Sequence, residues 1–255
     1  MKAVVIGSGN VAYHLAEQLV KAKHDLVQVA GRNKRTVKAL AKKYGVAGVA
    51  DLTKVDTSSD VIIIAVNDDS IREVVQALPF SDKIVLHTSG SVSLNIISSK
   101  FKNAGVFYPL QSLHKNKVSS NHKITWCVEA TSTKVLSILT KLAASMNGTA
   151  VKLNSEQRLH LHLAAVVVNN FVNHLFTLSA DFLQKNNVPF SLLTPLIAAT
   201  AEKIKMASPS TLQTGPAIRK DKKTMNRHLE LLKKDPHLRK MYKEFSLSIS
   251  TYYNR

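Results

Sequence analysis

A glycine-rich motif near the start of the chain could bind phosphate groups. Gly7-Ser8-Gly9-Asn10-Val11-Ala12 matches the pattern G-x-G-x-x-G/A, in which the first glycine permits a tight turn, the second lets the backbone approach a pyrophosphate, and the small last residue allows close packing. The motif follows a short apolar run and opens a helix-like segment, whose first N–H groups would face the phosphates. We therefore predict a dinucleotide site whose phosphate contacts are Gly7, Ser8, Gly9, Asn10 and Val11.

The end of the second predicted strand indicates which dinucleotide binds. An NAD site usually has Asp or Glu there, whereas this chain reads Ala30-Gly31-Arg32-Asn33-Lys34-Arg35. A carboxylate would repel a 2′-phosphate, but the planar guanidinium of Arg32 could pair with it and Lys34 would add positive charge. We predict NADP, with Arg32, Asn33 and Lys34 on the adenosine side. The alternative is that these are solvated loop charges.

Later strand ends should meet the same cofactor, because ligands bind outside the carboxyl ends of parallel strands. On the nicotinamide side we expect Ala65, Val66, Asn67, His87, Thr88 and Ser89. A third strand closes at Tyr108-Pro109-Leu110-Gln111, and there we expect Pro109 and Gln111 to line the substrate side.

The segment RLHLHLAAVVVNNFVNHLF, at 158–176, predicts a long helix with apolar residues on nearly every side, which is typical of a buried helix. At about 100° per residue, His162, Asn169 and Asn173 fall close to one line. This polar stripe could face the cofactor, with His162 as acid or base and the two asparagines orienting a carbonyl or imine. It could equally lie at a subunit or helix–helix contact. We predict no metal site.

The elements around these residues alternate in type up to about residue 153. Strand-like runs at 2–6, 26–30, 61–66, 83–87, 105–108, 125–129 and 150–153 are interleaved with helix-like segments, as in an α/β fold with a doubly wound parallel sheet of the Rossmann type. Beyond Asn154 we find only helical patterns. We predict two domains, 1–153 for NADP binding and 154–255 as an all-α substrate and dimerisation domain.

Composition narrows the possible partners. The net charge of +18 is spread along the chain without a basic tail, so a solvated basic surface is favoured over a nucleic-acid partner. The single Cys127 excludes an intrachain disulfide. We see no apolar run near the ~20 residues of a membrane span, and we expect a cytoplasmic protein without a membrane partner.

The combined motifs resemble a family of NADP oxidoreductases that join a Rossmann-like domain to a helical domain of unknown function. This family is similar to deazaflavin-dependent NADP oxidoreductases and pyrroline-5-carboxylate reductases. The resemblance rests on the glycine motif, Val66-Asn67-Asp68, His87-Thr88-Ser89-Gly90, Tyr108-Pro109-Leu110-Gln111, Arg158, His162, Ala164-Ala165, Asn169-Asn170-Phe171, Pro195-Leu196, Thr214-Gly215-Pro216, Arg219, Asp221 and His228.

The resemblance implies an all-α domain of the 6-phosphogluconate dehydrogenase type, a homodimer formed through the long helix, and a substrate cleft with Thr214, Arg219 and Asp221 near its mouth. Two departures stand out. The catalytic Lys of related hydroxyacid dehydrogenases is replaced by Ala165 or Val166, and Tyr108-Pro109 stands where His-Pro is expected.

We therefore expect an NADP(H)-dependent oxidoreductase that transfers hydride to or from a small carbonyl or imine substrate. His162 is the first candidate for acid–base catalysis, and Asn169 and Asn173 are the candidate positioning residues. The alternatives are a non-catalytic NADP-binding sensor or subunit and, on charge alone, a nucleic-acid binder.

Overall fold

The computed structural model describes residues 1–80, 82–115 and 123–253. It divides into two compact units, residues 1–166 and 167–255, and each is described by itself. This division lies beyond residue 153 because the helical turns after the last strand pack on the sheet. Where the functional domains meet remains a prediction.

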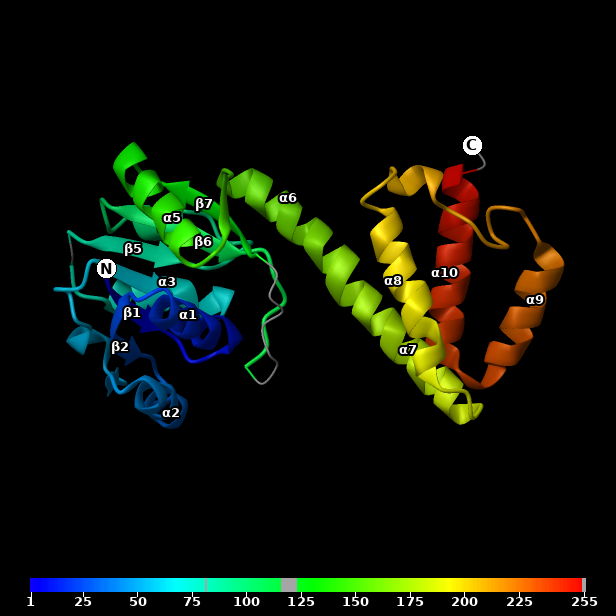
Figure 1. Cartoon of the computed structure of the whole chain (residues 1–255), viewed down its shortest axis with the longest axis horizontal. Helices are drawn as coiled ribbons and strands as arrows, with labels where there is room; N and C mark the ends of the chain where they lie inside the picture. The colour runs from blue at the N-terminus through cyan, green and yellow to red at the C-terminus, as the bar shows by residue number, and fades with distance from the viewer. Residues whose placement is uncertain (81, 116–122, 254–255) are drawn as a thin grey trace. The chain divides into compact units, whose positions relative to one another are not determined.

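The first unit contains one eight-stranded sheet in the order β3-β2-β1-β4-β5-β6-β7-β8 (Figure 1). Its strands are β1 (Lys2–Ile6), β2 (Asp25–Ala30), β3 (Ala47–Val49), β4 (Val61–Ile64), β5 (Ile84–His87), β6 (Ala104–Pro109), β7 (Thr125–Ala130) and β8 (Thr149–Lys152). The strand order reverses beside β1, which is the topological switch point of a Rossmann sheet. The predicted fold is thus confirmed, and β3 is a strand that the sequence analysis did not identify.

One pair of strands departs from the expected parallel arrangement. β6 and β7 are antiparallel, with Tyr108 opposite Cys127, while β8 is parallel to β7. Antiparallel neighbours such as β6 and β7 need no crossover helix between them. The hydrophobic periodicity of the sequence therefore does not indicate that this pair is antiparallel.

Helices cover both faces of this sheet. They are α1 (Asn10–Lys21), α2 (Lys34–Tyr44), α3 (Asp68–Ala77), α4 (Asn95–Ser98), α5 (Thr133–Ser145) and α6 (Ser155–Ala165), with a short 3₁₀ turn η1 (Leu52–Lys54). Within β4, Val61 and Ile63 join a core with α1, α2 and α5, whereas Ile62 and Ile64 join a second core with α3 and α4. An apolar strand buried on both faces is what the sequence predicted for this segment.

In the part of the second unit that the structure describes, the regular elements are all helices. It contains α7 (Val172–Lys185), η3 (Phe190–Leu193), α8 (Thr194–Lys203), η4 (Pro209–Thr211), α9 (Lys222–Leu231), η5 (Leu232–Lys234) and α10 (Pro236–Tyr253). These helices match the helical segments predicted beyond residue 154. Its longest helix, α10, contacts α7 and α9.

The long helix differs from its prediction in two respects. Between α6 and α7 the residues Val166–Phe171 form a π-helical stretch (η2), so the spacing of 100° per residue that aligned His162 with Asn169 and Asn173 does not hold through it. The helix is also not buried within this chain, because Leu163 and Val168 are 62% and 70% exposed. Its apolar residues therefore form an uncovered surface rather than a core.

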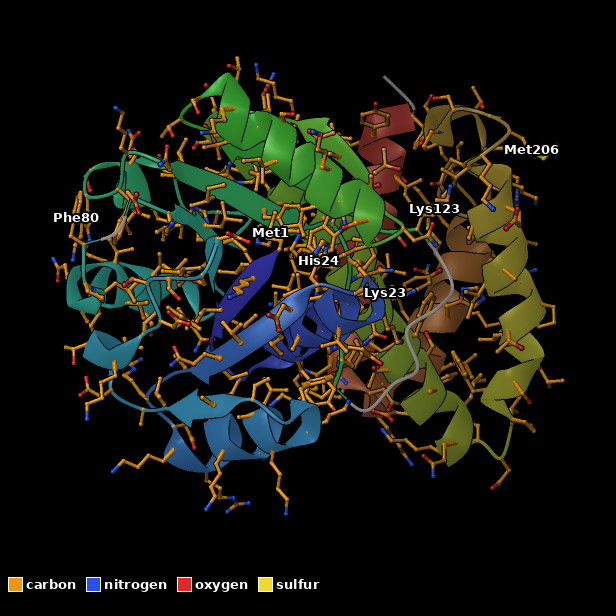
Figure 2. All side chains as sticks on the ribbon, turned by 60° about the vertical axis from the view of Figure 1, so that its left-hand side comes forward. Met1, Lys23, His24, Phe80, Lys123 and Met206 are labelled. Atoms are coloured by element: carbon orange, nitrogen blue, oxygen red, sulfur yellow. The ribbon has the colours of Figure 1, made fainter. Side chains whose placement is uncertain are left out.

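The stretch Ser155–Lys185 is also long and apolar enough, by length and composition alone, to cross a membrane. We expected no membrane-spanning segment from the sequence. Two other large apolar side chains, Phe80 and Met206, are 74% and 87% exposed, and both are labelled in Figure 2.

Candidate functional site

The glycine loop between β1 and α1 has the geometry of a phosphate-binding turn. Gly7 has a φ of +129°, and a Cβ there would lie 2.1 Å from the carbonyl oxygen of Ala65. Gly9 is the N-cap of α1 with no side-chain cap, and a Cβ on it would meet nothing within 4 Å. Free N–H groups beside open space are what a pyrophosphate needs, so the loop fits a dinucleotide.

Around the second strand, polar groups of three elements come together. Asn33 caps α2 by accepting a hydrogen bond from the backbone N–H of Thr36 at 3.1 Å, and the hydroxyls of Ser8 and Thr36 are 2.7 Å apart. These contacts place the start of α2, including the exposed Lys34, beside the glycine loop. Thr36 did not appear among the predicted residues, because only its contact with Ser8 identifies it.

Arg32, which the sequence predicts to bind the 2′-phosphate, forms contacts within the chain. Its guanidinium donates to the carboxylate of Glu73 at 2.7 Å and to the hydroxyl of Ser70 at 2.8 Å, both on α3. The side chains of Arg32 and Glu73 are 60% and 61% exposed. The ion pair is therefore a weak one that a phosphate could replace.

The carboxyl ends of β4 and β5 lie next to each other at the same edge. Asn67 is the N-cap of α3 but its side chain makes no cap bond, Val66 is half-buried, and Thr88 donates its backbone N–H to Ile64. Ser89 donates its backbone N–H to Nδ1 of His87 at 3.1 Å. These contacts bring the two predicted loops together.

His87 is fully buried, and burial first, then the nearby charge of Arg158, lower its pKa to about 4. Its imidazole is therefore neutral at physiological pH. A neutral ring that already accepts a bond from the backbone of Ser89 serves the loop structurally.

His162 lies against the loop that follows β5. Its Nδ1 is 3.0 Å from the hydroxyl of Tyr108, and the two rings meet edge to face with centroids 5.7 Å apart. A Cβ on Gly90 would lie 2.7 Å from Nδ1 of His162 and 2.9 Å from Cζ of Tyr108. The structure thus joins one predicted residue, His162, to Tyr108, which was not among the predicted site residues.

A buried ion pair sets the position of α6. Arg158, 1% exposed, is bonded to the carboxylate of Glu129 and to the carbonyl of Val92. The hydroxyl of Ser155 donates to Glu129 at 2.8 Å and accepts from the backbone N–H of Leu94 at 3.1 Å. Four residues after Arg158, one helical turn, comes His162, so this network holds it at the edge of the sheet.

The remaining predicted residues have separate environments. Pro109 is buried at the end of β6, Gln111 is exposed, and Asn10 accepts from the backbone N–H of Lys115 at 3.3 Å. In the second unit Asp221 caps α9 by accepting from the backbone and hydroxyl of Thr224, and these bonds lower its pKa. Of the predicted site residues in that unit, four are exposed: Asn169, Asn173, Thr214 and Arg219. Their roles remain predictions.

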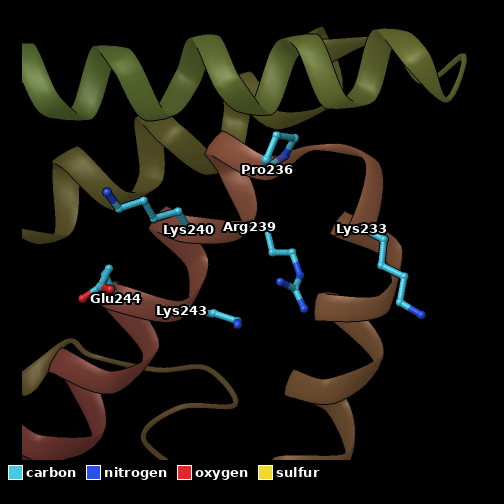
Figure 3. A pocket seen from close by; sticks show the side chains of 6 residues that line it. All are labelled: Lys233, Pro236, Arg239, Lys240, Lys243 and Glu244. Atoms are coloured by element: carbon cyan, nitrogen blue, oxygen red, sulfur yellow. The ribbon is translucent and has the colours of Figure 1, made fainter.

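The second unit also carries a basic cavity of about 290 Å³, shown in Figure 3. Its lining residues, all from η5 and α10, are Lys233, Pro236, Arg239, Lys240, Lys243 and Glu244. It contains none of the predicted site residues. Among the residues that the structure describes, no cluster of three or more His, Cys, Asp or Glu side chains could hold a metal.

The fold and the site together define a nicotinamide-dependent oxidoreductase. The features that do so are a Rossmann sheet, a glycine loop that fits a dinucleotide, and a Tyr–His pair beside the loop after β5. Residues 2–90 match the family model "NADP oxidoreductase coenzyme F420-dependent", and residues 124–249 match a domain of unknown function, DUF2520. The chain belongs to the family of NADP oxidoreductases that combine these two domains.

Solved structures agree with this assignment. A "putative NADP oxidoreductase BF3122" from Bacteroides fragilis is 34% identical over 98% of each chain, with a TM-score of 0.89. A reductive aminase from Aspergillus terreus, in complex with NADPH and ethyl levulinate, is 14% identical over 97% of this chain and 92% of that one, with a TM-score of 0.73.

A 1-pyrroline-5-carboxylate reductase from Streptococcus pyogenes is also 14% identical, over 98% of each chain, with a TM-score of 0.66. At this identity these two enzymes show the shared fold only. No curated protein matches the chain.

Proposed function

We propose that this protein is an NADP(H)-dependent reductase that transfers hydride to a small carbonyl or imine. The observation that carries the proposal is the contact of His162 with Gly90, because it brings an ionisable side chain to the sheet edge where the nicotinamide half of a dinucleotide lies. The reductive aminase and the pyrroline carboxylate reductase, which share the fold, suggest the substrate class.

We assign the following roles to the chain's own residues. The free N–H groups at the start of α1 hold the pyrophosphate, and Arg32, Asn33 and Lys34 hold the 2′-phosphate beside Ser8 and Thr36. When bound, NADPH supplies the hydride. His162 takes part in the acid–base step, and the positioning role of Asn169 and Asn173 in the second unit stays a prediction from the sequence.

The selectivity for NADP tests the adenosine side of the proposal. Replacing Arg32 by alanine should weaken NADPH binding about 10- to 100-fold, the value of one or two charge-assisted hydrogen bonds, and leave NADH binding unchanged. Arg227→Ala, on the exposed face of α9, removes the same charge as a control. Equal affinities of the unmodified protein for NADPH and NADH, measured by calorimetry, would contradict the assignment.

The reaction itself is tested by stopped-flow oxidation of NADPH with a panel of substrates. The panel contains ethyl levulinate with and without an amine, 1-pyrroline-5-carboxylate, and simple aldehydes and ketones. Turnover of at least one carbonyl or imine is expected. Tight NADPH binding without turnover of any of them would favour a sensor or subunit instead.

We further propose that two copies associate through the exposed apolar face of the long helix and that the protein is cytoplasmic. Exposed aliphatic patches of this kind are typical of protein interfaces. Analytical ultracentrifugation of the protein without detergent tests the association of two copies, and a dimer is the expected result. A helix that inserts into a membrane would instead make the protein require detergent for solubility.

A further inference from the structure

The contact between Tyr108 and His162 joins two side chains that can each donate and accept protons. The phenol oxygen and Nδ1 are 3.0 Å apart, a normal hydrogen-bond distance, and both side chains are half-buried rather than enclosed. Neither side chain is fully enclosed by the protein.

Gly90 makes this pair possible. Any side chain there would meet both rings at less than 3 Å, so Tyr108 and His162 occupy the space that a Cβ would fill. The glycine belongs to the loop that follows β5, whose preceding residues Thr88 and Ser89 are buried. The pair is thus fixed against the loop on the nicotinamide side.

The sheet itself brings Tyr108 to this edge. Pairing between β5 and β6 ends at His87 opposite Val106, whereas β6 continues to Pro109 beside β7. Tyr108 lies two residues beyond the end of β5 and, by the alternation of a strand, on the same face as Val106. Ligands of a Rossmann sheet lie beyond the carboxyl ends of the strands.

From this geometry we propose that Tyr108 is the proton donor to the substrate and that His162 acts through it as a positioning and relay residue. The assignment rests on the proposed reductase function and deepens it. It also gives a role to the tyrosine that stands where a histidine was expected in this family.

The proton and electron balance is complete. When bound, NADPH would supply a hydride to the carbon of a C=O or C=N bond, and the oxygen or nitrogen that gains the π electrons would take the proton of the Tyr108 hydroxyl. Nδ1–H of His162 would then return a proton to the phenolate oxygen while Nε2 takes one from water, and proton exchange with water restores the first tautomer of the ring. The net reaction consumes one NADPH and one solvent proton for each alcohol or amine formed.

The surroundings of Tyr108 keep the donor protonated. Burial is the main cause that raises the pKa of its hydroxyl above the ordinary value of 10, and the negative charge of Asp68 acts in the same direction. Cys127 faces it from β7, and its own pKa is raised by burial. The raised pKa keeps the hydroxyl of Tyr108 in the protonated form that a proton donor needs.

The chain offers a matched control for the key variant. His228 and Tyr242 form a second pair in the helical unit, with a hydrogen bond of 2.8 Å and the same edge-to-face geometry. Tyr108→Phe should lower kcat about 100-fold or more with a much smaller effect on KM and on NADPH affinity. Tyr242→Phe should leave kcat unchanged.

Two readouts separate a proton relay from a structural contact. In the protein without cofactor, nitrogen NMR of the His162 ring should show a change of tautomer in Tyr108→Phe and none in Tyr242→Phe. In His162→Ala, added imidazole should restore part of the lost turnover.

The outcomes are distinguishable. If the unmodified protein reduces no carbonyl or imine, the proposed function fails. If it turns over and Tyr108→Phe is equally fast, or if the His162 ring does not respond to the loss of the phenol, the proton-donor assignment is overturned while the reductase function stands.

Discussion

The guanidinium of Arg32 and the carboxylate of Glu73 form an ion pair, 2.7 Å apart, at the mouth of the predicted 2′-phosphate site. Arg32 follows β2 and Glu73 lies on α3, so the pair joins two segments that flank the glycine loop. A phosphate monoester that approaches Arg32 must compete with this carboxylate. Glu73 is therefore expected to tune the affinity for NADP.

Replacing Glu73 by glutamine should raise the affinity for NADPH about two- to fivefold, because an exposed ion pair of this kind contributes at most about 1 kcal/mol. The affinity for NADH should not change, since NADH has no phosphate at that position. Titration calorimetry at low and high salt measures both. A loss of NADPH affinity in this variant would show that Glu73 orients Arg32 rather than competing with its ligand.

Two glycines of the same loop should respond to substitution in opposite ways. Gly7→Ala should unfold the protein or lower its melting temperature strongly, because the methyl group would overlap the carbonyl of Ala65 at a φ that only glycine readily adopts. Gly9→Ala should fold normally but bind NADPH at least 10-fold more weakly, since the methyl group projects into the open space reserved for the pyrophosphate.

Gly45→Ala serves as the control for this pair. It has a φ of +67° but an open environment, so it should cost only about 1 kcal/mol and leave nucleotide binding intact. Thermal melting and calorimetry on the three variants give the comparison. Normal folding of Gly7→Ala would contradict the geometry of the loop.

The buried pair of Arg158 and Glu129 should matter for stability. Arg158→Met removes the positive charge beside the Glu129 carboxylate, which keeps only its bonds from Ser155, and should lower the free energy of unfolding by about 3–5 kcal/mol. The double variant with Glu129→Gln should be less destabilised than the sum of the two single changes, because both remove the same interaction. Urea unfolding measures the free energy of unfolding of each variant. If Arg158→Met lowers it by less than about 1 kcal/mol, the network of Arg158 and Glu129 is not formed.

His87 should make stability depend on pH. Its pKa is about 4 when folded, against an ordinary value of 6.5, so the unfolded chain binds a proton more readily. Its contribution is fully present above pH 6.5 and is lost as the pH falls from 6.5 to about 4, by on the order of 3 kcal/mol.

His87→Asn keeps an acceptor for Ser89 and should remove this part of the pH dependence. Because burial also lowers the pKa of His14 and His24, the comparison between the variant and the unmodified protein isolates His87. Urea unfolding at pH 7, 5.5 and 4.5 should give converging stabilities at low pH. Parallel curves for the two proteins would refute the assignment.

Local patterns in the sequence were sufficient to predict most of the fold. The apolar run of β4, the glycine loop and the helical segments after Asn154 each depend on neighbours in the chain, so spacing and residue type identify them. The antiparallel pairing of β6 with β7 depends on partners distant in the sequence, and no local period encodes it.

The candidate site shows the same limit. His162 could be selected from its position on a helix, but its contact with Tyr108, 54 residues earlier, needs the folded sheet. The pairing of Arg32 with Glu73 was hidden for the same reason. The burial expected for the long helix was wrong within one chain, because periodicity reports that a surface is apolar and not what covers it.

The uncovered apolar face of the long helix makes the stability of the protein depend on its concentration if two copies associate there. If a second copy covers Leu163 and Val168, dissociation must precede or accompany unfolding, and the melting temperature must rise with protein concentration. Dilution alone would then destabilise this protein at constant temperature and buffer, and assays at nanomolar concentration would sample a different species from those at micromolar concentration.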